Sequence, residues 1–215
     1  GAGGVIVPPS TYWPEIQRIC DQYGILLVSD EVICGFGRTG NWFGCETMGS
    51  KPDLMTFAKG VTSGYVPLGG VMVGERVAKV LIEQGGEFEH GYTYSGHPVA
   101  CAAAIATLNL YAQEKLFERA DQMGRVLGDA MHSAMRGLPN VVGIRSLGLA
   151  AVVELAPLPG APGKRAYDIF IDCFHKGSLV RPAGDNLVLA PPYIVEKSHI
   201  EQLIATLSES IKKHA

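Results

Sequence analysis

Two short apolar runs, each ending in a charged residue, constrain the fold of this chain most. The first run, Ile25–Ser29, ends in Asp30, and the second, Pro52–Ala58, ends in Lys59. The first is uninterrupted, rich in branched residues and bounded by glycines, which indicates a strand buried on both faces of a sheet. The sequence therefore predicts an α/β protein with strands that end at Asp30 and Lys59.

The ends of these two strands are a natural place for a ligand. Open parallel sheets bind ligands beyond the carboxyl ends of their strands, where Asp30 and Lys59 both fall. An amine and a carboxylate there are what a protein needs to hold an aldehyde cofactor covalently and to bias its electronics. Spacing alone leaves a second interpretation open, in which Asp30 caps the next loop and Lys59 is a solvated surface lysine.

Strands and helices alternate over residues 1–112, which predicts part of a large domain with a doubly wound, mostly parallel sheet. A helix with Pro14 in its first turn ends at Gly24. The later expected elements are a strand at 68–73, a helix at 75–84 and an alanine-rich helix from Pro98 to about Tyr111.

The pattern changes near Glu114, and residues 113–215 predict a smaller C-terminal α+β domain. Its final helix opens with Ser198 and Glu201 as a capping box. The other expected elements are a long amphipathic helix to Met135, strands at 141–145, 149–155, 179–181 and 187–190, and a helix at about 167–176.

Composition excludes several classes of function. The apolar share of 47% is enough for a packed core, and a net charge of −3 gives no electrostatic footprint for nucleic acid or an anionic membrane surface. No apolar segment is long and charge-free enough to span a bilayer. We therefore expect neither nucleic acid nor a membrane as a partner.

The cysteines and histidines give no sign of a metal or a disulfide framework. The five cysteines are scattered, without a C-x-x-C pair, and the six histidines form no ligand motif. Reduced thiols in a cytoplasmic protein without a metal are the expectation. The chain also lacks the residue order of a P-loop, a dinucleotide fingerprint and a Gly-x-Ser-x-Gly elbow.

Several blocks of sequence together resemble a known family. Leu27–Gly40, Pro52–Asp53 before Lys59, and His90–Pro98 occur in the order and with the spacing of the class III aminotransferases, pyridoxal-phosphate enzymes of fold type I. The resemblance runs from Gly1 to the C-terminal helix but covers about the second half of a family chain. It implies a truncated chain that lacks the family's cofactor-phosphate loop and the aromatic that stacks on the cofactor ring.

The resemblance assigns roles around the two strand ends. Lys59 would hold pyridoxal 5′-phosphate as a Schiff base and then move the substrate proton as general base and acid. We expect Lys59 to be buried, because desolvation favours the neutral amine. Asp30 would meet the pyridine nitrogen, and Val32, expected on the same side of the strand, would pack on the ring. Ile33 replaces a glutamine of many family members and resembles the ω-amine:pyruvate branch.

Two further positions come from the resemblance. Tyr92 and Thr93 lie in the block that crosses a dimer interface in the family and binds the partner's cofactor phosphate, which implies a homodimer with shared sites. Arg181 matches the arginine that receives a substrate carboxylate, and a planar bidentate donor suits pyruvate. An ordinary salt bridge is the other interpretation of Arg181.

The resemblance thus implies a transaminase that moves an amino group from a primary amine, polyamine or ω-amino acid to pyruvate or a similar keto acid. Another class III activity, a decarboxylating transaminase or an aminomutase, is the alternative within enzymes. A catalytically incomplete fragment that supplies only half of the fold and a dimerisation surface is the alternative outside them. The identity of the amine donor stays open.

Overall fold

The computed structural model describes residues 1 and 3–215, which form two compact units. One unit is continuous and comprises Pro8–Phe117. The other is discontinuous, because it combines Gly1–Val7 with Glu118–Ala215.

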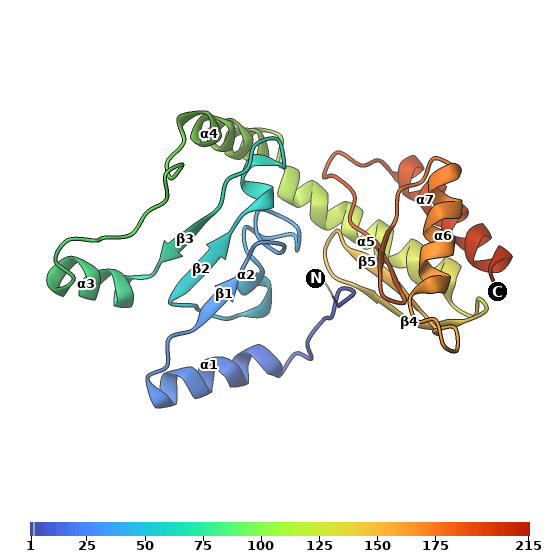
Figure 1. Ribbon diagram of the computed structural model, residues 1–215, viewed down its shortest axis with the longest axis horizontal. Coiled ribbons are helices and arrows are strands. Elements are labelled where there is room, and N and C mark those ends of the chain that lie inside the picture. The colour runs from blue at the N-terminus through green and yellow to red at the C-terminus, as the bar shows by residue number, and fades with distance from the viewer. Residues whose placement is uncertain (2) are drawn as a thin grey trace. The chain divides into compact units, whose positions relative to one another are not determined.

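A three-stranded sheet in the order β1-β2-β3 forms the centre of the continuous unit (Figure 1). Its strands are β1 (Val28–Asp30), β2 (Leu54–Phe57) and β3 (Gly70–Val73). β1 and β2 pair in parallel and β2 and β3 pair antiparallel. The two apolar runs of the sequence therefore form strands, as predicted, and these strands are parallel neighbours.

The expectation that the first strand is buried on both faces is wrong for this sheet. Along β1 only Ser29 is buried, and Val28 is 52% exposed. Ile25 and Leu26, just before the strand, are exposed as well. β1 is an outer strand of the described sheet, and the described segments leave its face at Val28 and Asp30 uncovered.

The helices of this unit agree closely with the sequence pattern. α1 ends where predicted, because Gly24 adopts a left-handed conformation with φ of 65° and its N–H donates to the carbonyl of Cys20. α3 has the predicted bounds, and Pro98 opens α4. The helices are α1 (Tyr12–Tyr23), α2 (Gly44–Met48), the 3₁₀ helix η1 (Lys59–Thr62), α3 (Glu75–Gln84) and α4 (Pro98–Gln113).

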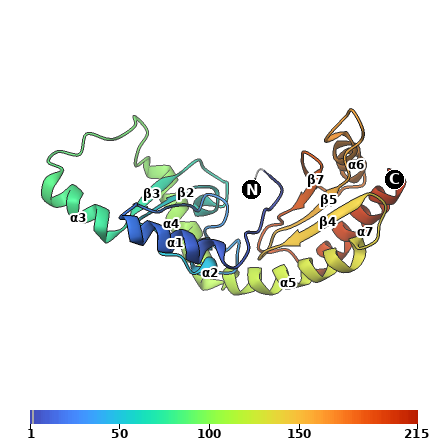
Figure 2. The ribbon, with the colours of Figure 1, turned by 90° about the horizontal axis from the view of Figure 1, so that it is seen from below.

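The discontinuous unit contains a four-stranded antiparallel sheet in the order β4-β5-β7-β6. Figure 2 shows α5 and α7 running alongside β4 and β5. The strands are β4 (Val141–Ser146), β5 (Ala151–Leu155), β6 (Arg181–Ala183) and β7 (Asn186–Leu189), and the helices are α5 (Leu116–Met135), α6 (Lys164–His175) and α7 (Lys197–Lys213).

The core of this unit lies between its sheet and its helices. Leu127, Met131 and Met135 of α5 are fully buried and belong to one cluster with Leu187 and Leu207. Burying one such side chain stabilises the folded state by about 1.5–3 kcal/mol. The methionines thus act as core filler, as the sequence pattern indicates.

Two boundaries differ from the prediction. The cap of α7 is Glu196, whose N–H donates to His199 Nδ1 at 3.3 Å, so the expected capping box of Ser198 and Glu201 is wrong. Ser198 already lies inside the first turn, beyond the position where a hydroxyl caps. β6 begins later than expected because Ala183 pairs with Asn186 across a two-residue turn.

Arg145 ties the N-terminal segment to the rest of the discontinuous unit. Its guanidinium donates to the carbonyl of Gly4 at 2.9 Å and to that of Val5 at 3.4 Å. The same group donates to Asn186 Oδ1 at 3.0 Å and pairs with Glu154. The first residues of the chain are therefore part of this unit through hydrogen bonds to β4.

The described residues carry few special features. No helix among them combines the length and the apolarity that a membrane crossing requires. All five cysteines are free thiols. In residues 1 and 3–215, no cluster of three or more His, Cys, Asp or Glu side chains is arranged to hold a metal ion.

Candidate active site

The pairing of β1 with β2 brings Asp30 and Lys59 to the same end of the sheet, at the carboxyl ends of the two strands. Asp30 is the last residue of β1 and pairs with Thr56 of β2, three residues before Lys59. Neighbouring strands lie about 4.8 Å apart. Both side chains are exposed, so the carboxylate and the amine share an accessible strand-end surface.

The Asp30 carboxylate is held through one of its two oxygens. Oδ1 accepts from the backbone N–H of Val32 at 3.1 Å and from Thr56 Oγ1 at 3.2 Å. The first bond caps the following turn, as the structural interpretation of Asp30 predicted. Oδ2 receives no hydrogen bond from any described residue. The carboxylate is thus oriented and still has an oxygen available for a cationic group.

Lys59 has an unusual backbone conformation. Its φ is 47°, in the left-handed region, and it opens η1 directly after β2. Within the described chain its amine has neither an ion pair nor a hydrogen bond. The expectation that Lys59 is buried is wrong for this chain, because the strand ends at a hollow of about 610 Å³ that Lys59 lines together with Thr62 and Val66.

A tyrosine that sequence reasoning missed supports the lysine turn. Tyr111 of α4 is 5% exposed, and its hydroxyl donates to the carbonyl of Gly60 at 2.7 Å. Burial is the main reason why the pKa of Tyr111 is raised. A side chain at Gly60 would place its Cβ 3.0 Å from Phe36 Cβ, so the turn also packs against the loop after β1.

Glu31, next to Asp30, was also missed. It is 2% exposed, and its carboxylate accepts from Ser29 Oγ and from the backbone N–H groups of Gly44 and Cys45. Burial, followed by the charge of Glu31, raises the pKa of the Cys45 thiol to about 11. A second acid directly after Asp30 at the end of an apolar run was the available signal.

The two residues expected to contact the cofactor ring lie in the turn after β1. Because β1 ends at Asp30, strand alternation does not apply to Val32, and that part of the reasoning was wrong. Val32 is half-buried, whereas Ile33 is 45% exposed. Val32 remains next to Asp30 through the hydrogen bond of its N–H.

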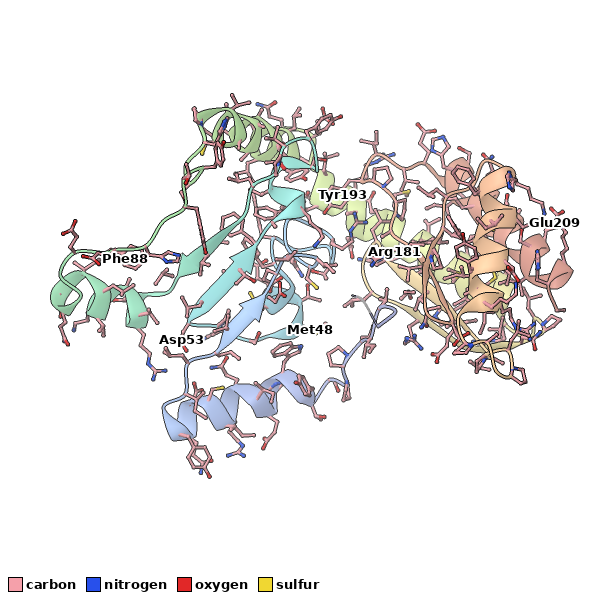
Figure 3. The ribbon with its side chains drawn as sticks, in the orientation of Figure 1. Met48, Asp53, Phe88, Arg181, Tyr193 and Glu209 are labelled. Atoms are coloured by element: carbon pink, nitrogen blue, oxygen red, sulfur yellow. The ribbon has the colours of Figure 1, made fainter. Side chains whose placement is uncertain are left out.

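Tyr92 and Thr93 lie in the long connection between α3 and α4, which Figure 1 shows as a segment without helices or strands. Tyr92 is 76% exposed and Thr93 is exposed. The N–H of Tyr92 donates to Ser95 Oγ at 2.9 Å, and the N–H of Ser95 donates back to the Tyr92 carbonyl at 2.9 Å. Phe88 marks the same connection in Figure 3.

Arg181 is the first residue of β6, at the edge of the four-stranded sheet (Figure 3). Its side chain is exposed. No ion pair of Arg181 occurs in the described part of the chain, so the alternative of an ordinary salt bridge finds no support. A planar group with five donors is free to receive a carboxylate.

Comparison with known families decides the relationship of this chain. The family described as Aminotransferase class-III matches residues 1–211. This chain belongs to the class-III aminotransferase family. The family that the sequence blocks predicted is confirmed.

Similar sequences in this family are transaminases. A putrescine–pyruvate aminotransferase of Pseudomonas aeruginosa is 42% identical over 225 residues, which cover 100% of this chain and 48% of the relative. An omega-aminotransferase of Caulobacter vibrioides is 45% identical over 96% of this chain and 48% of the relative. The chain spans about half the length of the curated relatives that it matches.

Solved structures confirm the fold class. An omega transaminase from Pseudomonas jessenii in complex with PMP matches with a TM-score of 0.94 and 38% identity, over 100% of this chain and 49% of that one. An (S)-enantioselective omega-transaminase from Thermomicrobium roseum matches with a TM-score of 0.93 and 40% identity over 100% of this chain and 49% of that one. The α/β fold of this family is thus shared along the whole chain.

Proposed function

We propose that the protein is a pyridoxal-phosphate-dependent transaminase that moves an amino group from a primary amine, polyamine or ω-amino acid to pyruvate or a similar keto acid. The observation that carries this proposal is the pairing of Asp30 with Thr56 of β2, the strand that Lys59 follows after one intervening residue, in a chain of the class-III aminotransferase family. Relatives named for putrescine–pyruvate and omega-amine transfer support the substrate class.

The side chains at the strand ends fit the cofactor. Pyridoxal phosphate needs an amine for its aldehyde, and Lys59 has an exposed amine without a partner among the described residues. Its ring nitrogen needs a carboxylate, and Oδ2 of Asp30 is available while Oδ1 is held by Val32 and Thr56. When bound, the cofactor supplies an electron-withdrawing ring that stabilises negative charge at the substrate carbon.

The residues of this chain supply position and proton transfer. Lys59 Nζ is the proposed general base that removes the proton from the substrate carbon and returns it. The carboxylate of Asp30 is the proposed partner of the ring nitrogen and would favour its protonated form. Val32 is the proposed contact on one ring face, and Ile33 lies beside it in the same turn. These roles form one proposal about the site, with Lys59 as its chemical centre.

Arg181 is the proposed site for the carboxylate of the keto acid. Its guanidinium is exposed and, as far as the described chain extends, forms no ion pair. Binding of a substrate carboxylate therefore does not require an existing ion pair to break. A bidentate pair of charge-assisted hydrogen bonds suits pyruvate better than a diamine, which has no carboxylate. The two half-reactions therefore differ in their need for Arg181.

A homodimer with shared sites, in which Tyr92 and Thr93 serve the partner's cofactor phosphate, belongs to the same proposal. The exposure of both side chains supports it. A domain boundary near residue 112, next to the end of α4, is also part of the proposal. So is a cytoplasmic location, which the free thiols support.

Borohydride trapping tests the proposal. We expect reduction of the full-length protein to fix the cofactor to Lys59, as located by peptide mass spectrometry. Lys59→Ala should lower transamination between putrescine and pyruvate at least a thousandfold, about 4 kcal/mol in barrier height. Lys51→Ala, which changes another exposed lysine, is the matched control. Attachment elsewhere, or turnover retained by Lys59→Ala, would remove the assignment.

The same assay addresses the alternatives. Release of carbon dioxide or isomerisation of the substrate, in place of amine transfer, would favour a decarboxylating transaminase or an aminomutase. Residues 1–215 assayed alone show whether this part of the protein binds the cofactor by itself. Absence of both cofactor binding and turnover in the full-length protein would favour a role limited to folding and dimerisation.

A further inference from the structure

A buried carboxylate lies directly beside the exposed one at the end of β1. Glu31 is 2% exposed, and Oε1 accepts from Ser29 Oγ at 3.0 Å and from the N–H of Cys45 at 2.7 Å. Oε2 accepts from the N–H of Gly44 at 2.7 Å. Burying a carboxylate costs several kcal/mol unless hydrogen bonds compensate it, so these donors are necessary for Glu31 to stay in place.

The backbone of Glu31 is held as firmly as its side chain. Its N–H donates to the carbonyl of Thr56 at 2.9 Å, which extends the pairing between β1 and β2. Its carbonyl accepts from the N–H of Gly35 at 2.8 Å. Glu31 therefore fixes the chain between Asp30 and the turn that follows, from both of its backbone groups and both of its carboxylate oxygens.

The close approach of Glu31 to α2 depends on a glycine. A Cβ added at Gly44 would lie 3.0 Å from Oε2 of Glu31 and 2.7 Å from the Cβ of Cys34. The absence of a side chain there lets the carboxylate reach the first two N–H groups of α2. The turn after β1 is thus locked to a second segment of the unit.

This lock acts on the one carboxylate that the proposed chemistry needs. Oδ1 of Asp30 is oriented by the N–H of Val32, and Glu31 is the residue that joins the two. Rotation of the peptide units around Glu31 would move that N–H and leave Oδ1 of Asp30 with Thr56 Oγ1 alone, which widens the range of rotamers open to Asp30. The hydrogen bonds of Glu31 oppose this rotation.

We infer that Glu31 is a positioning residue for the transamination: its buried carboxylate locks the turn after β1 onto α2 and so holds Asp30 in the orientation that meets the cofactor ring nitrogen. The inference rests on the proposed function. Glu31 itself touches neither cofactor nor substrate. It acts through Asp30, and this dependence is what an experiment can detect.

A double-mutant cycle in the full-length protein tests the inference. Glu31→Gln keeps the shape but directs an amide NH₂ at the N–H of Gly44 or Cys45, two donors facing each other. We expect the single-turnover rate with an amine donor to fall about 10- to 100-fold and the pH midpoint of the cofactor absorbance to shift. In an Asp30→Asn background, Glu31→Gln should change the rate by less than about twofold, because coupled residues are not additive.

The control is another carboxylate with a purely structural contact. Asp53, labelled in Figure 3, directly precedes β2 and accepts from the N–H of Leu27, the residue before β1, at 2.9 Å. Asp53→Asn should leave the rate and the pH midpoint unchanged. A rate for Glu31→Gln within twofold of the parent, or losses that multiply with those of Asp30→Asn, would overturn the inference.

A milder variant covers the case in which Glu31→Gln does not fold. Ser29→Ala removes one of the three donors to Glu31 and should slow the rate about 3- to 10-fold, again only while Asp30 is present. An unchanged single-turnover rate for Ser29→Ala would then overturn the inference. If the parent protein shows no transamination, or if Asp30→Asn leaves it unaffected, the proposed function fails instead.

Discussion

The backbone of Lys59 leads to a prediction about stability with a definite sign. A left-handed φ of 47° costs a residue with a Cβ about 1–2 kcal/mol relative to glycine. Glycine lowers the free energy of unfolding by about 0.4–1 kcal/mol relative to alanine, because its unfolded chain has more conformational freedom. The difference favours Lys59→Gly over Lys59→Ala by about 0.5–1 kcal/mol. Both variants lack the amine, so both should be inactive, and only their stabilities should differ.

Urea unfolding of the two variants without cofactor measures this difference. At an ordinary helical or extended position, glycine is less stable than alanine by about 0.5–1 kcal/mol, so the expected order is reversed here. An alanine variant more stable than the glycine variant would refute the argument that Lys59 is strained. The expected order would mean that the proposed chemical centre carries a cost to folding, offset by contacts such as the hydrogen bond from Tyr111 to Gly60.

Three further predictions concern charged side chains. Asp30→Asn should leave the cofactor bound, seen by its absorbance, but slow the proton-transfer step; unchanged half-reaction rates would remove Asp30 from the site. Arg181→Ala should weaken pyruvate use by about 2–5 kcal/mol in transition-state binding and affect a monoamine donor much less; equal losses in single-turnover rates would end the carboxylate role. Lys213, followed by Lys176, lowers the pKa of Asp172, so this group adds stability above about pH 4 that is lost as the pH falls further. Asp172→Asn should flatten the acid limb of the unfolding curve, and an unchanged limb would contradict this.

Local sequence signals predicted most elements because their causes are local. Gly24 ends α1 through its own left-handed conformation, and Pro98 opens α4 as the first helical residue. The bounds of α3 follow from its periodic apolar face. Where a boundary depends on pairing, as in β6, the prediction shifted by two residues, because the partner strand decides it.

The sequence predicted the positions of Asp30 and Lys59 near strand ends but not the residues that support them. Asp30 and Lys59 stand at strand ends, which sequence reveals. Glu31 and Tyr111 act through Gly44 and Gly60, 13 and 51 residues away along the chain, and no periodic pattern reports such contacts. The exposure of Lys59 was missed for the same reason, since burial depends on which other segments cover a strand end.

The hydrogen bonds of Arg145 to Gly4 and Val5 also affect the order in which the chain folds. They close a loop that contains the whole of Pro8–Phe117, and closing a flexible loop of about 140 residues costs about 4 kcal/mol of chain entropy. Contacts this distant in sequence form slowly, so the N-terminal segment should dock after the intervening unit has become compact. A single proteolytic cut within Pro8–Phe117 would remove the covalent link, and only non-covalent contacts would then keep the segment bound to β4.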